Sequence, residues 1–213
     1  MKQVFIKEVP TMDEIIVNKT TISETDTVET KFASYGVSFS IIKNEHLRNA
    51  VLRYFVDIVP KYFWHVQASS TGKYHPDYAL GEEGLLRHTC AAVRIAIDIM
   101  NREMYNLIFD DIDKDNIIVA LMLHDTFKHG EEKDGKYNPY SIHEHPLLSA
   151  DKVREHLDDE HKYAIANCIA SHMGEWTESN RSSYVLPKPK TLEEQMVHLC
   201  DYLASRKYLE FKF

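Results

Sequence analysis

The sequence predicts an all-α protein: a helical bundle that follows a short N-terminal extended or β segment. The chain has 213 residues, enough for one sizeable core but short for two ordinary domains. Apolar residues recur at three- and four-residue spacing through most of the chain beyond residue 44, as in helices with one buried face. With 44% hydrophobic and 27% charged residues, the composition is that of a globular protein and excludes disorder.

Residues 1–43 are the predicted N-terminal arm or small β element. They mix β-branched residues with acidic and Thr-rich stretches and show no sustained helical period. We therefore expect one or two short strands or an extended arm here. Residues 44–213 form the predicted helical domain.

The first helix of that domain is expected to begin after Asn44, a residue favoured at helix N-caps. Its apolar positions follow at helical spacing until Pro60 ends the pattern. Residues 61–81, rich in aromatic and turn-forming residues, predict a structured loop. The later helices are indicated by five apolar stripes: Leu85, Ala92, Ile95 and Ile99; Ile117 to Leu123; Leu147, Ala150, Val153 and Leu157; Tyr163, Ile165 and Ile169; and Leu192, Met196, Leu199 and Leu203.

Two features precede or mark the start of the last expected helix. Thr191 and Glu194 have the spacing of a capping box. Residues 174–190 have no period and predict a loop of a length that is more often functional than accidental.

The charge and cysteine content narrow the function and the compartment. Twenty-five basic and thirty-three acidic residues give a formal net charge of −8, which argues against binding to long nucleic acids or anionic membranes. The chain has no apolar run near the ~20 residues of a membrane span and no signal-peptide pattern. Three cysteines without a C-x-x-C pair fit a reduced, cytoplasmic protein.

Several polar residues occupy positions that should face the core. His88 follows Leu85 by three residues and precedes Ala92 by four, so it shares their inward face. His124 and Asp125 end the most hydrophobic helix, where a buried imidazole beside a carboxylate is costly unless it is paired or metal-bound.

The same pattern recurs in three more helices. His172 follows the apolar stripe of residues 165–169, and Asp201 lies on or near the inward stripe of the last helix. His145 precedes Pro146, a residue favoured in the first turn, which places His145 at a helix start. Five helices would therefore each deliver a polar residue or a His-Asp pair to the centre.

A single inward histidine is more often an ordinary core residue than a ligand. Four histidines and two aspartates together would leave several buried polar groups without partners unless a cation binds them. Imidazole and carboxylate ligands suit one or two divalent ions, two if Asp125 bridges them, and do not distinguish Fe, Mn, Zn, Co, Ni or Mg. His143 is the alternative to His145, and we treat His75, His129 and His198 as non-ligands.

In order and helical placement these residues resemble the HD-domain superfamily of metal-dependent phosphohydrolases, in its binuclear four-His, two-Asp form. The resemblance covers roughly residues 84–207. It implies a helical fold, one ion held by His88, His124, Asp125 and Asp201, and a second held by Asp125, His145 and His172. It also implies that Lys128, in an H-D-x-x-K motif, lies near the substrate phosphate.

This resemblance and the charges predict a hydrolase that cleaves a phosphoester of a nucleotide or related small anion. Two divalent ions and two carboxylates leave about +2 at the centre, a local positive site in a negative protein. Such ions lower the pKa of bound water from ~15.7 toward ~7, which supplies a hydroxide nucleophile. Asp125 and Lys128 are the predicted catalytic residues; whether Asp125 also accepts the proton of that water is left open.

Further substrate-binding residues are proposed from position alone. Lys128 ranks first, followed by Lys73 and Arg206, and Ser70 lies in a polar loop before His88 that could grip an anion. That loop lacks the P-loop spacing and is equally explained as a surface turn. Loop aromatics, Trp176, Tyr184 and Tyr140, could stack on a base or simply cover the core edge.

The sequence leaves two other functions open. The first is a mixed-valent di-iron oxygenase on the same ligands, and the second is a non-catalytic module stabilised by metal. The expected partner is a small phosphorylated substrate, with no membrane and no long nucleic acid. The sequence leaves self-association into a homo-oligomer open.

Overall fold

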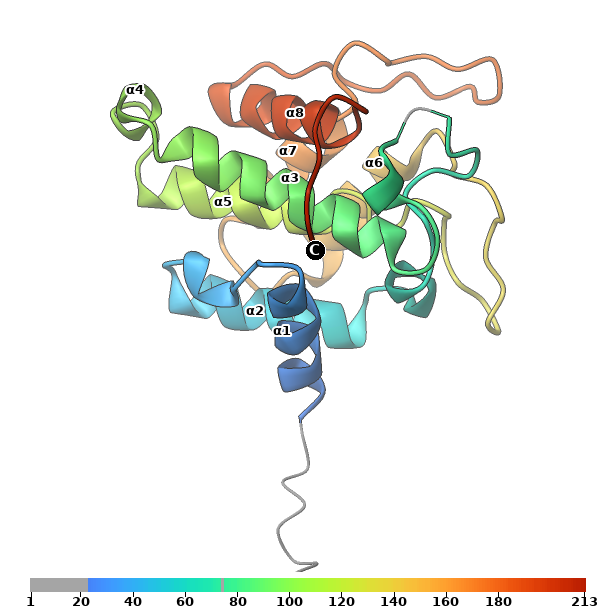
Figure 1. Ribbon diagram of the computed structural model, residues 1–213, viewed down its shortest axis with the longest axis horizontal. Coiled ribbons are helices and arrows are strands. Elements are labelled where there is room, and N and C mark those ends of the chain that lie inside the picture. The colour runs from blue at the N-terminus through green and yellow to red at the C-terminus, as the bar shows by residue number, and fades with distance from the viewer. Residues whose placement is uncertain (1–22, 74) are drawn as a thin grey trace, which may run out of the picture.

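The computed structural model describes residues 23–73 and 75–213, and these residues form a helical bundle (Figure 1). The prediction of an all-α fold is confirmed: within the described ranges the only β pairings are two isolated bridges. No described helix is long and apolar enough to span a membrane. The α-helices are α1 (Glu24–Ser34), α2 (Glu45–Asp57), α3 (Gly84–Met100), α4 (Glu103–Asn106), α5 (Asp111–Leu123), α6 (His145–His156), α7 (Lys162–Ser171) and α8 (Leu192–Ala204), and 3₁₀ turns cover Phe39–Ile41, Lys61–Trp64 and Asp77–Ala79.

Helix α5 is the centre of the bundle. It packs against α3, α7 and α8, while α6 packs on α7, and α1 and α2 pack on each other (Figure 1). All residues from Ile117 to Leu123 are buried, which explains why this segment is apolar on every side. The two residues that directly follow this buried segment, His124 and Asp125, are buried as well.

The predicted helix starts are largely confirmed. The Asn44 side chain accepts a hydrogen bond from the Leu47 amide at 3.1 Å, and α6 begins at His145 with Pro146 in its first turn. Thr191 caps α8 by accepting from the Glu194 amide. The Glu194 carboxylate, however, accepts from the amide of Lys190 and not from that of Thr191, so the capping box is incomplete.

The expectation of a β or extended element is wrong for the described residues 23–43. Helix α1 begins there, with a capping box between Ser23 and Asp26. Val28 and Phe32 are its only buried residues, too few to produce a recognisable helical period. Residues 1–22 of the expected element lie outside the described residues, and the boundary between residues 43 and 44 stays a prediction.

Segment 23–43 is held to the bundle by aromatic packing and by one buried carboxylate. The Phe32 ring lies 5.0 Å from that of Phe55 and 5.3 Å from that of Phe39, in edge-on contacts. Asp115 of α5 accepts hydrogen bonds from the amides of Lys43 and Asn44 at 2.9 and 2.7 Å. The segment is therefore part of the same core as α2 and α5.

We expect Phe32→Ala to lower the free energy of unfolding by about 3–5 kcal/mol, because the fully buried ring leaves a cavity among its aromatic neighbours. Glu29→Ala, on the exposed face of α1, is the control and should change stability by no more than about 0.5 kcal/mol. Urea unfolding measures both. Equal stability of the two variants would show that α1 does not belong to the cooperative core.

Candidate metal centre

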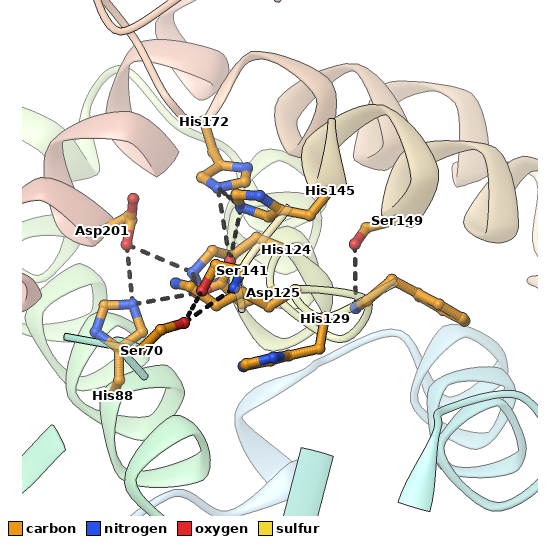
Figure 2. A network of polar contacts seen from close by, with 12 residues as sticks. Ser70, His88, His124, Asp125, His129, Ser141, His145, Ser149, His172 and Asp201 are labelled. Atoms are coloured by element: carbon orange, nitrogen blue, oxygen red, sulfur yellow. Dashed lines mark hydrogen bonds and ion pairs between the residues drawn. The ribbon is translucent and has the colours of Figure 1, made fainter. Parts of the chain in front are cut away.

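The six side chains that the sequence predicts as ligands converge (Figure 2). They come from α3, from the C-terminal ends of α5 and α7, from the first residue of α6 and from α8. Three groups of three have ligand atoms within 4.8 Å of one another: His88, His124 and Asp125; His124, His172 and Asp201; and Asp125, His145 and His172. Each group combines imidazole nitrogen with carboxylate oxygen, a donor set that suits a divalent transition metal. All six predicted residues belong to at least one group.

Asp125 lies at the middle of the cluster, and its two oxygens face different histidines. Oδ2 lies 3.4 Å from His124 Nε2 and 3.7 Å from His88 Nε2. Oδ1 lies 3.1 Å from His145 Nε2 and 3.8 Å from His172 Nε2. A carboxylate placed in this way could contact a metal ion with each oxygen.

Asp201 lies next to the first of these histidine pairs, His88 and His124. Its Oδ1 lies 3.0 Å from His88 Nε2 and 3.5 Å from His124 Nε2. The cluster therefore divides into one side with two carboxylates and another with His145 and His172, whose Nε2 atoms are 3.3 Å apart.

Backbone carbonyls fix the orientation of three of the histidines. The Nδ1 atoms of His124, His145 and His172 each lie 2.7 Å from the carbonyl oxygen three residues earlier. His124 and His172 are the C-caps of α5 and α7, where the last carbonyls of a helix lack partners within it. Because a carbonyl only accepts, Nδ1 must donate, and in the neutral ring the lone pair is then on Nε2, facing the cluster.

With all of its histidines neutral, the cluster is a poor structure until a cation, either a proton or a metal ion, enters it. The Nε2 lone pairs of His145 and His172 face each other, and His124 Nε2 and Asp125 Oδ1 are buried with no hydrogen bond. Buried polar atoms without partners cost free energy that ion coordination would recover. The residues present therefore fit divalent metal ions.

The comparison with protein families agrees with this geometry. A family model described as HD domain matches residues 85–206, more than half of the chain. The chain belongs to the HD-domain family. The matched range contains all six residues of the cluster, which confirms the resemblance drawn from the sequence. The searches of curated proteins and of solved structures found no match.

The electrostatics of this HD-domain cluster keep its carboxylates ionised. Burial opposes ionisation of Asp125, but Lys128 and His124 hold its pKa well below the ordinary value. Burial likewise opposes protonation of His124, yet Asp125 and Asp201 raise its pKa to about 10. Burial and the neighbouring His124 lower the pKa of His172 to about 3. Without a metal, a proton on His124 provides the positive charge that the two carboxylates require.

The cluster opens into a cavity of about 630 Å³. Of the four predicted substrate-binding residues, Lys128 and Arg206 line it, and Lys128 forms a short ion pair with Asp125 Oδ2. Ser70 and Lys73 do not line it. The Ser70 hydroxyl accepts instead from the Ser141 amide at 2.9 Å, and the neighbouring Ser69 reaches the cavity wall.

The other histidines are not in the cluster, although two are close to it. His143 lines the cavity and lies 3.2 Å from the Thr177 carbonyl through Nε2, so the structure favours His145 as the cluster member. The His75 ring packs 5.2 Å from that of His88. His129 donates to the Asn138 carbonyl from Nδ1.

His198, which the sequence predicts to be a non-ligand, positions a cluster residue. Its Nδ1 donates to the backbone carbonyl of His172 at 2.8 Å. Gly174 turns the chain there with φ of +64°, and a Cβ at Gly174 would lie 2.1 Å from the His198 ring. The signal was present in the sequence: His198 precedes Asp201 by three residues on one helix face, and a glycine follows His172 by two.

The affinity of the cluster for divalent metal ions should increase as the pH rises. Because the pKa of His124 is raised, the imidazole is protonated at neutral pH and must lose that proton before Nε2 can coordinate. We expect release of about one proton per first ion bound and an affinity that rises about tenfold per pH unit between pH 6 and 8. Calorimetric titration with Mn²⁺ in buffers of different ionisation enthalpy measures both. Binding without proton release would contradict this protonation state.

His198→Phe should weaken metal binding about tenfold, since it keeps a ring but removes the donor that holds His172. His198→Asn, whose amide donates from a similar position, should recover much of the affinity. His156→Phe, on a histidine outside the cluster, is the control. Mn²⁺ titration of the four proteins tests this, and equal affinities would leave His198 with a packing role only.

Proposed function

We propose that this HD-domain protein is a metal-dependent phosphohydrolase that cleaves a phosphoester of a nucleotide or a related small anion. HD domains are in general metal-dependent phosphohydrolases, and the chain has the family's His/Asp cluster. The observation that carries the proposal is Asp125, whose two oxygens face two histidine pairs while Lys128 binds it from the cavity side.

The chain's own residues divide the work of such a reaction. The four histidines, Asp125 and Asp201 would hold divalent ions, which supply Lewis acidity toward water and the phosphoryl oxygens. Lys128 keeps Asp125 ionised and presents its ammonium to the cavity, where it can bind a phosphoryl oxygen. Asp125, His124 and His172 are almost completely buried, and electrostatic interactions are stronger in such a low-dielectric setting than in water.

Covalent catalysis by cysteine has no support. Cys90, Cys168 and Cys200 are buried, none lines the cavity, and burial raises the pKa of each thiol. A nucleophile activated at the cluster is therefore the simpler mechanism.

The cavity fits a substrate of moderate size. Its volume lies within the range of small-molecule sites. Two cations besides Lys128 line it, Arg181 and Arg206, in a chain whose formal net charge is −8. A small anion is thus attracted locally, while the protein as a whole repels long polyanions.

The test is phosphate release from a panel of nucleoside mono-, di- and triphosphates with Mn²⁺, Co²⁺, Zn²⁺, Ni²⁺, Mg²⁺ or Fe²⁺. We expect Lys128→Met to lower kcat/KM about 10²- to 10³-fold, since it removes a cation beside the reacting phosphate. Asp125→Asn should abolish both metal binding and turnover. Lys136→Met, outside the cavity lining, is the matched control.

Two outcomes would contradict the proposal. Full phosphate release by purified Asp125→Asn would show that the cluster is not the active site. Consumption of dioxygen with iron, in the absence of phosphate release from any nucleotide, would support the oxygenase alternative.

A further inference from the structure

Arg206 follows the end of α8 and lines the cavity beside the cluster. Its guanidinium carbon lies 4.2 Å from the centre of the Tyr202 ring and 5.2 Å from that of Trp176. These two rings are stacked on each other, 5.6 Å apart with 9° between their planes. Aromatic contacts of this kind hold a guanidinium by cation–π attraction without using its N–H donors.

The donors of Arg206 have no acceptor in the described parts of the chain. Its side chain makes no hydrogen bond or ion pair there, and its Nε is buried without a partner. Two other arginines differ: Arg87 donates to the carbonyls of Tyr78 and Leu80, and Arg154 pairs with Asp151. Arg94 is also held over two rings, those of Phe211 and Phe213, but it does not line the cavity. Five rigidly placed donors beside a cavity, held by rings alone, match an anion supplied by a ligand.

The Arg206 guanidinium is separate from the Lys128 ammonium, which is expected to bind the reacting phosphate. Lys128 is paired with Asp125, inside the cluster. Arg206 comes from the segment after α8, and Arg181 comes from the loop between α7 and α8; both line the cavity. Among the described residues of the lining, the only carboxylate is Asp201, which belongs to the cluster. The remainder of the cavity is therefore positive.

We propose that the substrate carries two anionic groups: the phosphoester at the cluster, and a second group, carboxylate or phosphate, that Arg206 binds with help from Arg181. Both groups match the fork of a guanidinium, which can bind either through two parallel hydrogen bonds. This inference rests on the proposed hydrolase function. A phosphoester that lacks the second anionic group is therefore expected to be a poor ligand.

Non-hydrolysable ligands test this without depending on turnover. Phenylphosphonate and 4-carboxyphenylphosphonate differ by one carboxylate, and calorimetry on the Mn²⁺-loaded full chain gives the ratio of their Kd values. We expect the carboxylate to tighten binding to the wild type at least about tenfold. Arg206→Met should reduce this ratio to about twofold or less, Arg206→Lys should retain part of it, and Arg181→Met should reduce it less than Arg206→Met.

Lys207→Met removes the same charge one residue away, on an exposed side chain outside the cavity, and should keep the wild-type ratio. The inference is overturned if the wild type shows no preference or does not bind the carboxylate ligand. It is also overturned if Arg206→Met keeps the preference, or if Lys207→Met loses it equally. A preference that depends on Arg206 in a protein that hydrolyses no phosphoester would support the second anion site and overturn the hydrolase function instead.

Discussion

An ionised carboxylate buried at the end of the most hydrophobic helix is the constraint around which the bundle is organised. Asp125 is 1% exposed, and its charge cannot stay in that position without positive charge and donors close by. Helices α3, α6 and α7 each bring an imidazole to it, and Lys128 brings an ammonium. The arrangement of these helices around α5 is thus linked to one electrostatic requirement.

In α5 and α7, a single hydrogen bond at the C-terminal end both caps the helix and orients a histidine of the cluster. At each C-terminus the histidine Nδ1–H donates to a carbonyl of the last turn, Leu121 in α5 and Ile169 in α7, and this contact turns Nε2 toward the cluster. No separate orienting residue is needed for His124. For His172 the structure adds one, because His198 also holds its backbone carbonyl. The side of the cluster with fewer carboxylates therefore receives the additional support.

The helices and the cluster could be predicted because periodicity reports which face of a helix is buried. His88 and His172 share faces with apolar neighbours, and the ends of the predicted helices placed His124, Asp125 and His145. Helix α1 could not be predicted in this way, since two buried residues define no stripe and its stability comes from a cap and from packing across the chain. In loops, side-chain direction follows no period. For that reason the sequence does not distinguish Ser70 from Ser69, which reaches the cavity, and gives no signal for Arg181.

The distribution of charge would allow an acidic protein to bind the proposed small anion. The formal net charge of −8 produces a repulsive field that grows with the length of an approaching polyanion, whereas the positive groups lie inside one cavity. Lys128 serves the cluster end of that cavity, and Arg206 is held by Tyr202 and Trp176 instead of by a carboxylate. A carboxylate partner would have neutralised the guanidinium and competed with the ligand. The aromatic rings hold it in place and leave its donors without an acceptor among the described residues, which is the condition that the proposed second anion site requires.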